Sequence, residues 1–267
     1  MFNYSNINDT FGLIIKNINI NKTTDENHKQ LLLSLFYKYS LMIIPNQDIG
    51  KKDLINFTSI FGDPIEHPTN IKNRDIEFPQ ITIISNIKKN GFEIGALGSE
   101  EIDFHSDLVF CYKPGAVSIL YCVDTPPTGG NTYWTDNISA LKELNPDIKK
   151  IILNKKIIYK HRNDKYNEEP LACHSIICKH PISKNNYLFF SPSSAFKILE
   201  FNTVKPINIF EHLYEHITQN KFVIMHKWKK GDLIIWDNRT TMHKRDEFDE
   251  SINRLMYRTQ TIGNISM

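Results

Sequence analysis

The chain has 267 residues, a formal net charge of +2, and a composition of 40% hydrophobic and 23% charged residues, which is ordinary for a globular protein. Lysine and arginine are spread between acidic residues instead of forming a basic stripe, so the sequence argues against a nucleic-acid partner. All-β domains often reach this length undivided, and we expect a single domain over residues 1–267.

The sequence pattern predicts no targeting segment and no membrane segment. The first ten residues are polar and lack the basic start and apolar run of a signal peptide. The longest apolar stretch, residues 31–45, is interrupted by Ser34, Lys38 and Ser40 and is too short to span a bilayer. Four cysteines do not make a disulfide framework in a chain of this size. We therefore expect a cytoplasmic protein without a membrane partner.

The N-terminal part of the chain predicts two helices around a strand. Apolar residues recur at helical spacing over residues 25–39, and a short apolar strand follows at 41–44. Residues 51–61 predict a second helix, which ends at Gly62 and Pro64.

From residue 80 onward, short runs of β-branched and aromatic residues alternate with clusters of Gly, Pro and Asn. Such strands with little αβ alternation favour an antiparallel double sheet over a parallel α/β fold. We predict a mainly β fold, α+β by content, built as a double-stranded β-helix or jelly roll with flanking helices. The strands are predicted at 81–85, 116–123, 156–159, 187–190, 232–236 and 255–262, and helices at 138–144 and 205–219.

Two metal-binding residue types stand two positions apart in His105-Ser106-Asp107. On an extended strand, such residues project from the same face. A histidine from a neighbouring strand would complete a 2-His-1-carboxylate triad, which leaves open positions on a non-haem Fe(II). The candidate is His243, which follows an apolar strand and a polar turn. Alone, His-x-Asp is weak evidence, because a surface histidine near an aspartate is common.

Two arginines follow this second histidine, Arg254 and Arg258. An arginine that faces inward from a strand needs an anion or an acidic partner. A guanidinium offers two parallel donors that match a carboxylate. The alternative is that both arginines pair with surface acids nearby in the sequence, such as Asp246 and Glu250.

These segments resemble the TauD/TfdA (taurine dioxygenase-like) family of Fe(II)/2-oxoglutarate-dependent oxygenases. Four pieces match in order, and together they extend from about residue 31 to residue 263. They are the Phe-Gly turn at 61–64 with His67-Pro68, the metal motif at 105–107 with Pro114 downstream, the Gly-Gly-x-Thr loop within 127–134, and the C-terminal signature from Gly231 through His243 to Arg254 and Arg258.

The resemblance implies a non-haem dioxygenase that uses Fe(II), 2-oxoglutarate and O2. It implies that His105, Asp107 and His243 hold the metal. Thr132 and Arg254 would bind the distal carboxylate of 2-oxoglutarate, and Arg258 would approach its proximal carboxylate or an anionic group of the substrate. The implied reaction oxidises a C–H bond of a small, charged organic molecule and releases succinate and CO2. Related halogenases carry a small residue in place of the aspartate, so Asp107 favours oxygenation.

The resemblance also suggests substrate-binding residues. His67 and Arg258 match positions that hold the sulfonate in the taurine enzyme, whereas Glu101 stands where that enzyme has an asparagine. A carboxylate facing a sulfonate would repel it, so taurine itself is not expected. Phe104 and Phe110 flank the metal motif and either line the pocket or belong to the core. A fainter likeness around residues 97–110, to family members of isonitrile pathways, leaves open oxidative decarboxylation or desaturation of an amino-acid-derived intermediate.

Other readings of the sequence remain. Cys173, His174, Cys178 and His180 could be read as a zinc site, but their spacing is unlike the paired Cys-x-x-Cys of structural sites. A non-catalytic metal-binding jelly-roll module is a second function, which the intact set of predicted ligands disfavours. A hydroxylase of protein or nucleic acid would need a charged groove, for which the sequence shows no concentrated basic face. The substrate, the pathway and the oligomeric state, a homo-oligomer included, stay open.

Overall fold

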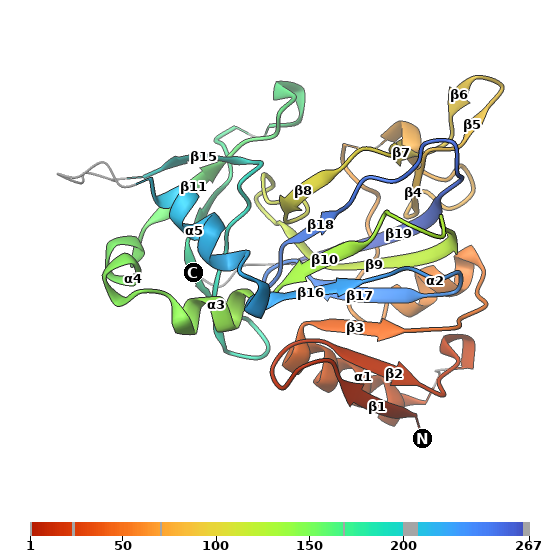
Figure 1. The fold of residues 1–267 in the computed structure, drawn as a ribbon, viewed down its shortest axis with the longest axis horizontal. Helices are drawn as coiled ribbons and strands as arrows, with labels where there is room; N and C mark the ends of the chain where they lie inside the picture. The colour runs from red at the N-terminus through yellow and green to blue at the C-terminus, as the bar shows by residue number, and fades with distance from the viewer. Residues whose placement is uncertain (1, 23–24, 70, 168, 200–207, 264–267) are drawn as a thin grey trace.

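Two β-sheets packed against each other form the body of the protein, for which we use a computed structural model (Figure 1). The structure describes residues 2–22, 25–69, 71–167, 169–199 and 208–263. No helix in these described ranges is both long and apolar enough to cross a membrane.

The large sheet has eight strands and is antiparallel except for the pairs β2–β3 and β4–β7. The small sheet has four strands, all antiparallel. In spatial order, the large sheet contains β1 (Asn3–Asn6), β2 (Leu13–Lys16), β3 (Leu41–Ile44), β17 (Leu233–Asp237), β9 (Gly115–Asp124), β19 (Leu255–Ile262), β4 (Thr82–Ser85) and β7 (Ala96–Leu97), and the small sheet contains β16 (Val223–His226), β10 (Thr132–Thr135), β18 (His243–Arg245) and β8 (Ile102–His105).

The remaining elements lie mostly at one end of the two sheets, on the left in Figure 1, or cover the large sheet. The helices are α1 (Glu26–Tyr39), α2 (Lys51–Thr58), α3 (Asn137–Glu143), α4 (Pro146–Ile152) and α5 (Ile209–Ile217). The smaller sheets contain β5 (Lys88–Lys89), β6 (Phe92–Glu93), β11 (Lys156–Tyr159), β12 (Cys173–Ser175), β13 (Ile177–Lys179), β14 (Asn186–Leu188) and β15 (Ala195–Ile198), and short 3-10 helices occur at η1 (Ile20–Lys22), η2 (Ile71–Asn73), η3 (Asp164–Tyr166) and η4 (Asn220–Phe222).

Helix α1 follows from its sequence at both ends. Asp25 caps the N-terminus by accepting a hydrogen bond from the Asn27 N–H at 3.1 Å. Ser40 ends the helix in the left-handed region at φ 60°, where its N–H donates to the Phe36 carbonyl. The apolar stripe of α1 packs with α2 on the outer face of the large sheet.

Strand β17 shows why two layers form. Leu233 and Ile235 belong to the cluster under the helices, whereas Ile234 and Trp236 belong to the cluster between the sheets. The ring of Trp236 lies 5.7 Å from that of Trp134 on β10. Because side chains alternate along a strand, a continuous apolar run buries both faces of β17. Each such side chain contributes about 1.5–3 kcal/mol.

The predicted mainly β architecture with flanking helices agrees with the structure. Helix α2 ends at Thr58 and not at residue 61, because a tight turn follows in which the Phe61 N–H donates to the Thr58 carbonyl. The helix predicted at 205–219 is α5, and residues 205–207 lie outside the described ranges. The predicted strand at 187–190 begins one residue earlier and ends at Leu188.

The pattern of apolar runs missed the small sheet. Strands β8, β10 and β18 mix polar with apolar residues and have no continuous apolar run, whereas β16 has only a short one, Val223–Met225. The Gly-Gly-x-Thr segment, predicted as a loop, enters strand β10 at Thr132.

A buried ion network joins β17 to the segment after β13. Asp237 accepts hydrogen bonds from His180 Nε2 at 2.9 Å and from Arg239 Nε and Nη2 at 2.8 and 2.6 Å. Burial alone raises the pKa of Asp237, but Arg239 and His180 outweigh it and hold that pKa well below its usual range. Within the C-terminal signature, Asp237 and Arg239 therefore serve the fold.

We expect Asp237→Asn to lower the free energy of unfolding by about 3–5 kcal/mol, because it leaves Arg239 buried without a counter-ion. Urea unfolding at neutral pH measures this change. The control is Asp164→Asn, which removes the exposed Lys160–Asp164 pair and is expected to leave the free energy of unfolding nearly unchanged, because solvent screens this pair. Equal losses in both variants would contradict a stabilising role of the network.

Candidate metal and anion site

The three predicted metal ligands lie together at the end of the small sheet. His105 on β8 is directly opposite His243 on β18, and their ring centroids are 4.1 Å apart. Asp107 Oδ1 lies 3.9 Å from His105 Nε2, and Asp107 Oδ2 lies 3.9 Å from His243 Nε2. One ligand atom from each residue falls within 4.8 Å of the others, and no second such cluster occurs in the described ranges.

The prediction that His105 and Asp107 lie on one strand was wrong. Strand β8 ends at His105, and Asp107 begins a turn in which Leu108 has φ 54°. The Asp107 carbonyl accepts a hydrogen bond from the Gly115 N–H at 3.3 Å, and a Cβ at Gly115 would lie 2.8 Å from that oxygen. The glycine at the start of β9 thus permits the close approach that sets the carboxylate beside the two imidazoles.

Both imidazoles can present a lone pair to a cation. His105 Nδ1 lies 2.8 Å from the Asp103 carbonyl and donates to it, which leaves Nε2 as the unprotonated nitrogen. Burial, followed by the charge of His105, lowers the pKa of His243 to about 3. The His243 ring is therefore neutral at neutral pH, as a metal ligand must be.

Asp107 is fixed by side chains from the large sheet. Its Oδ2 accepts from Ser118 Oγ on β9 and from Gln260 Nε2 on β19, both at 2.9 Å. Arg258 Nη1 is 3.4 Å from Oδ1, and Asn238 donates to Ser118 Oγ at 2.7 Å. Burial alone raises the pKa of Asp107, but Arg258 and the two imidazoles hold it well below its usual range. The carboxylate is thus anionic and oriented.

Arg254 is a buried cation without an acidic partner. Arg254 is 1% exposed, and its Nε has no hydrogen-bond partner in the described part of the chain. No carboxylate among the described residues pairs with it. Burial, followed by the nearby charge of Arg245, lowers its pKa to about 9. The predicted alternative, an ion pair with the acids after β18, is absent from the described residues. An anionic ligand would satisfy this guanidinium.

Thr132 lines the same cavity as Arg254, together with both imidazoles of the cluster. Its Oγ1 accepts a hydrogen bond from Trp228 Nε1 at 2.8 Å, so its own proton is left for an acceptor in the cavity. Gly129 and Gly130 have φ of 76° and 63°. A Cβ at Gly129 would lie 2.8 Å from the Glu247 carbonyl, which explains the glycines before Thr132.

His67 lies close enough to Arg258 and Asp107 for both charges to act on its pKa. Burial first, then Arg258, lowers the pKa of His67 to about 3, and Asp107 acts on it in the opposite direction. His67 Nδ1 accepts from the Thr69 N–H at 3.2 Å. His161, which sequence reasoning did not include among the site residues, also lowers the pKa of His67 and therefore lies nearby.

The other predicted substrate residues are placed less directly. Phe104 and Phe110 are buried in the cluster formed with α3, α4 and α5, and the Phe110 ring lies 4.6 Å from that of His161. Glu101 is exposed and forms an ion pair of 2.6 Å with Lys244. Because Lys244 offsets the Glu101 charge at the surface, Glu101 is no longer expected to repel a sulfonate.

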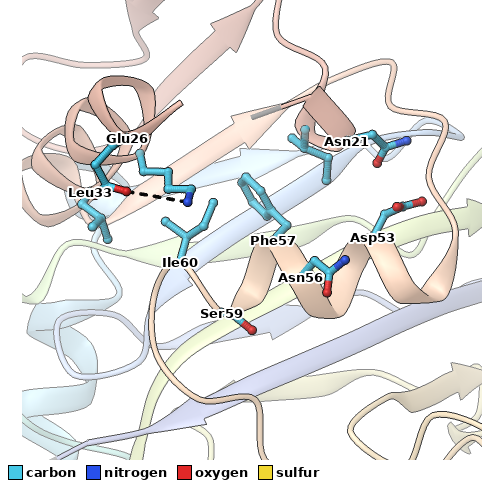
Figure 2. Close-up of a pocket in the computed structure, with 10 residues that line it drawn as sticks. Asn21, Glu26, Leu33, Asp53, Asn56, Phe57, Ser59 and Ile60 are labelled. Carbon is cyan, nitrogen blue, oxygen red and sulfur yellow. Dashed lines mark ion pairs between the residues drawn. The ribbon is translucent and has the colours of Figure 1, made fainter. Parts of the chain in front are cut away.

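Two further regions can be separated from this site. His174 Nε2 lies 3.1 Å from the carbonyls of Val109 and Cys111, and Cys178 Sγ contacts the Ser175 carbonyl, so the predicted zinc alternative gains no ligand cluster among described residues. A surface pocket of about 440 Å³ lies between α1 and α2. Figure 2 shows its lining, and none of the candidate site residues belongs to it.

Comparisons with known proteins give one consistent family. The family described as "Taurine catabolism dioxygenase TauD, TfdA family" matches residues 4–260. Pentalenolactone F synthase of Streptomyces avermitilis is 22% identical, with 94% of this chain and 90% of that protein covered. A 2,4-dichlorophenoxyacetate dioxygenase of Burkholderia sp., named as alpha-ketoglutarate-dependent, is 27% identical, with 84% and 82% covered.

Solved structures are similar over the whole fold. AAD-2 in complex with Mn(II) and N-oxalylglycine superposes with a TM-score of 0.81 at 26% identity and covers 99% of this chain and 98% of that one. A taurine dioxygenase from Burkholderia xenovorans superposes with a TM-score of 0.83 at 22% identity and covers 98% and 90%.

We expect Gln260→Leu to weaken binding of Mn(II) by about 10–100-fold, because ligands lose affinity when a partner that orients them is removed. Titration calorimetry on metal-free protein measures this. The control is Tyr257→Phe, on the opposite face of β19, which should leave the affinity unchanged. Unaltered Mn(II) affinity in Gln260→Leu would mean that Asp107 needs no support from β19.

Proposed function

The chain belongs to the TauD, TfdA family of dioxygenases, and we propose that it oxidises a C–H bond of a small, charged organic substrate with Fe(II), 2-oxoglutarate and O2, releasing succinate and CO2. The convergence of His105, Asp107 and His243 beside a buried, unpaired guanidinium supports this function best. The proposal includes a single domain whose two facing sheets form a double-stranded β-helix.

The donor set fits Fe(II). Two imidazoles and one carboxylate make up the facial triad, and these three side chains would hold the metal and leave room for further ligands. In this proposal Ser118 and Gln260 hold the carboxylate of Asp107 in one orientation. Iron, 2-oxoglutarate and O2 together supply the oxidising power when bound.

The donors that line the cavity also match the co-substrate. The Arg254 guanidinium and the Thr132 hydroxyl proton are donors without an acidic partner in the described residues, and both line the cavity beside the two imidazoles. A carboxylate held by these donors would leave the 2-oxo acid end of the molecule toward the metal. Binding at both ends keeps the co-substrate in one orientation and excludes water from it.

The substrate is proposed to carry an anionic group. Among the described residues, Arg258 has an unpartnered Nε and a contact of 3.4 Å from Nη1 to Asp107, and the neutral ring of His67 lies near it. A cation and a hydrogen-bonding ring on one side of the metal favour a sulfonate, sulfate or carboxylate over an amine. These residues would position the substrate with its C–H bond toward the metal.

We expect the protein to release labelled succinate from labelled 2-oxoglutarate when it is loaded anaerobically with Fe(II) and then exposed to O2. His243→Ala and His105→Ala are expected to abolish this release and to lower the bound metal per chain, measured by elemental analysis. A circular dichroism spectrum verifies that each variant folds. Wild-type turnover in a folded variant without bound metal would overturn the proposed ligand set.

A separate expectation concerns Arg254→Met, which removes the charged contact to the distal carboxylate. A contact of about 1.5–3 kcal/mol corresponds to a KM for 2-oxoglutarate roughly 10–100 times higher, with a much smaller change in the KM for the substrate. Steady-state succinate release measures both constants. Lys230→Met, which removes an exposed positive charge, serves as the control. An unchanged KM for 2-oxoglutarate would show that another group binds this carboxylate.

A further inference from the structure

Arg245 is a further buried guanidinium in the cavity, in addition to Arg254 and Arg258. It is 5% exposed, it lines the cavity with Arg254 and Thr132, and its Nε and Nη1 have no hydrogen-bond partner in the described part of the chain. Its Nη2 donates to the Glu100 carbonyl. The only acidic group that acts on its pKa is Glu100, whose side chain is exposed.

The register of the small sheet places Arg245 opposite Thr132, in a row of side chains next to the row that contains His243. His243 on β18 is opposite Trp134 on β10, and two residues further on Arg245 is opposite Thr132. Directly opposed residues project from the same face of a sheet, and two residues along a strand span about 7 Å. The small sheet therefore presents a metal row and, one step away, a row with a hydroxyl and a guanidinium.

Arg254 reaches the same place from the large sheet, at the start of β19. The guanidinium carbons of Arg245 and Arg254 lie 5.2 and 5.7 Å from the centroid of the Phe248 ring. The charge of Arg245 is also one of the causes that lower the pKa of Arg254. Two like charges that line one cavity repel each other, and an anion between them would offset this repulsion.

We propose that Arg245 is a second guanidinium for the distal carboxylate of the co-substrate, so that this carboxylate is held from both sheets. The inference rests on the proposed function, because it assigns a ligand group of the same co-substrate. A carboxylate has acceptor positions for two guanidiniums and a hydroxyl. The contact from Arg245 Nη2 to the Glu100 carbonyl would in addition fix the segment just before β8, which carries the first metal ligand.

This arrangement makes the enzyme select 2-oxo acids by their far end. A 2-oxo acid without a distal carboxylate leaves both guanidiniums buried without an anion, and such unpaired buried groups disfavour binding. The wild-type protein should therefore bind 2-oxoglutarate much more tightly than pyruvate, which has the same metal-binding end. Removing Arg245 should reduce this difference.

The test is calorimetric titration of the Mn(II)-loaded full chain with 2-oxoglutarate and, by competition, with pyruvate. Arg245→Met is expected to weaken binding of 2-oxoglutarate by about 10–100-fold while changing pyruvate binding less than threefold. Arg245→Lys keeps the charge without the paired donors and should give an intermediate loss. Lys244→Met, the next residue on β18, removes a positive charge that faces Glu101 and should leave both affinities unchanged.

Two results would overturn the assignment. Equal affinity for 2-oxoglutarate in the wild-type protein and in folded Arg245→Met would show that this guanidinium does not contact the carboxylate. A loss shared equally by pyruvate would show that Arg245 acts only on the metal end, through the segment before β8. Failure of the wild-type Mn(II) protein to bind 2-oxoglutarate at all would instead count against the proposed function.

Discussion

Charge buried between two sheets is the constraint on which the rest of this structure depends. One half of the space between them is filled by apolar rings such as Trp134 and Trp236. The other half holds Asp107 and three arginines, all buried. Isolated charges in such a place destabilise a fold. The negative charge of Asp107 is offset by the nearby imidazoles and by hydroxyl and amide donors. Arg245 and Arg254, in contrast, have no acidic partner among the described residues.

The sequence predicted the large sheet and the helices over it better than the small sheet, for a physical reason. Strands buried on both faces, such as β9 and β17, have mostly apolar sequences that are easy to recognise. Strands β8, β10 and β18 of the small sheet carry polar site residues between apolar ones, so they lack that signal. His105, Asp107 and His243 were predicted because of residue types and the family resemblance. The turn that carries Asp107 could not be predicted, because Gly115, eight residues away, permits it.

Two site residues were missed although a signal existed in the sequence. On β19, Arg258 and Gln260 are two residues apart and share the face that reaches Asp107. On β18, Arg245 stands two residues after His243 and shares its face in the same way. Applying period-two alternation outward from each predicted ligand would have found both. His161 gives no such signal, since it lies in a loop and approaches the site only through the tertiary fold.

In the proposed function, the same alternation would join metal binding and carboxylate recognition in one rigid unit. His243 and Arg245 are on one short strand, and Thr132 and Trp134 are on its neighbour, so four backbone positions define the spacing between the metal row and the carboxylate row. Residues on paired strands hold such spacing more closely than residues on loops. A molecule that bridges the two rows must match their separation. The side facing His67 and Arg258 is built from other segments, so changes there need not alter the spacing between the two rows.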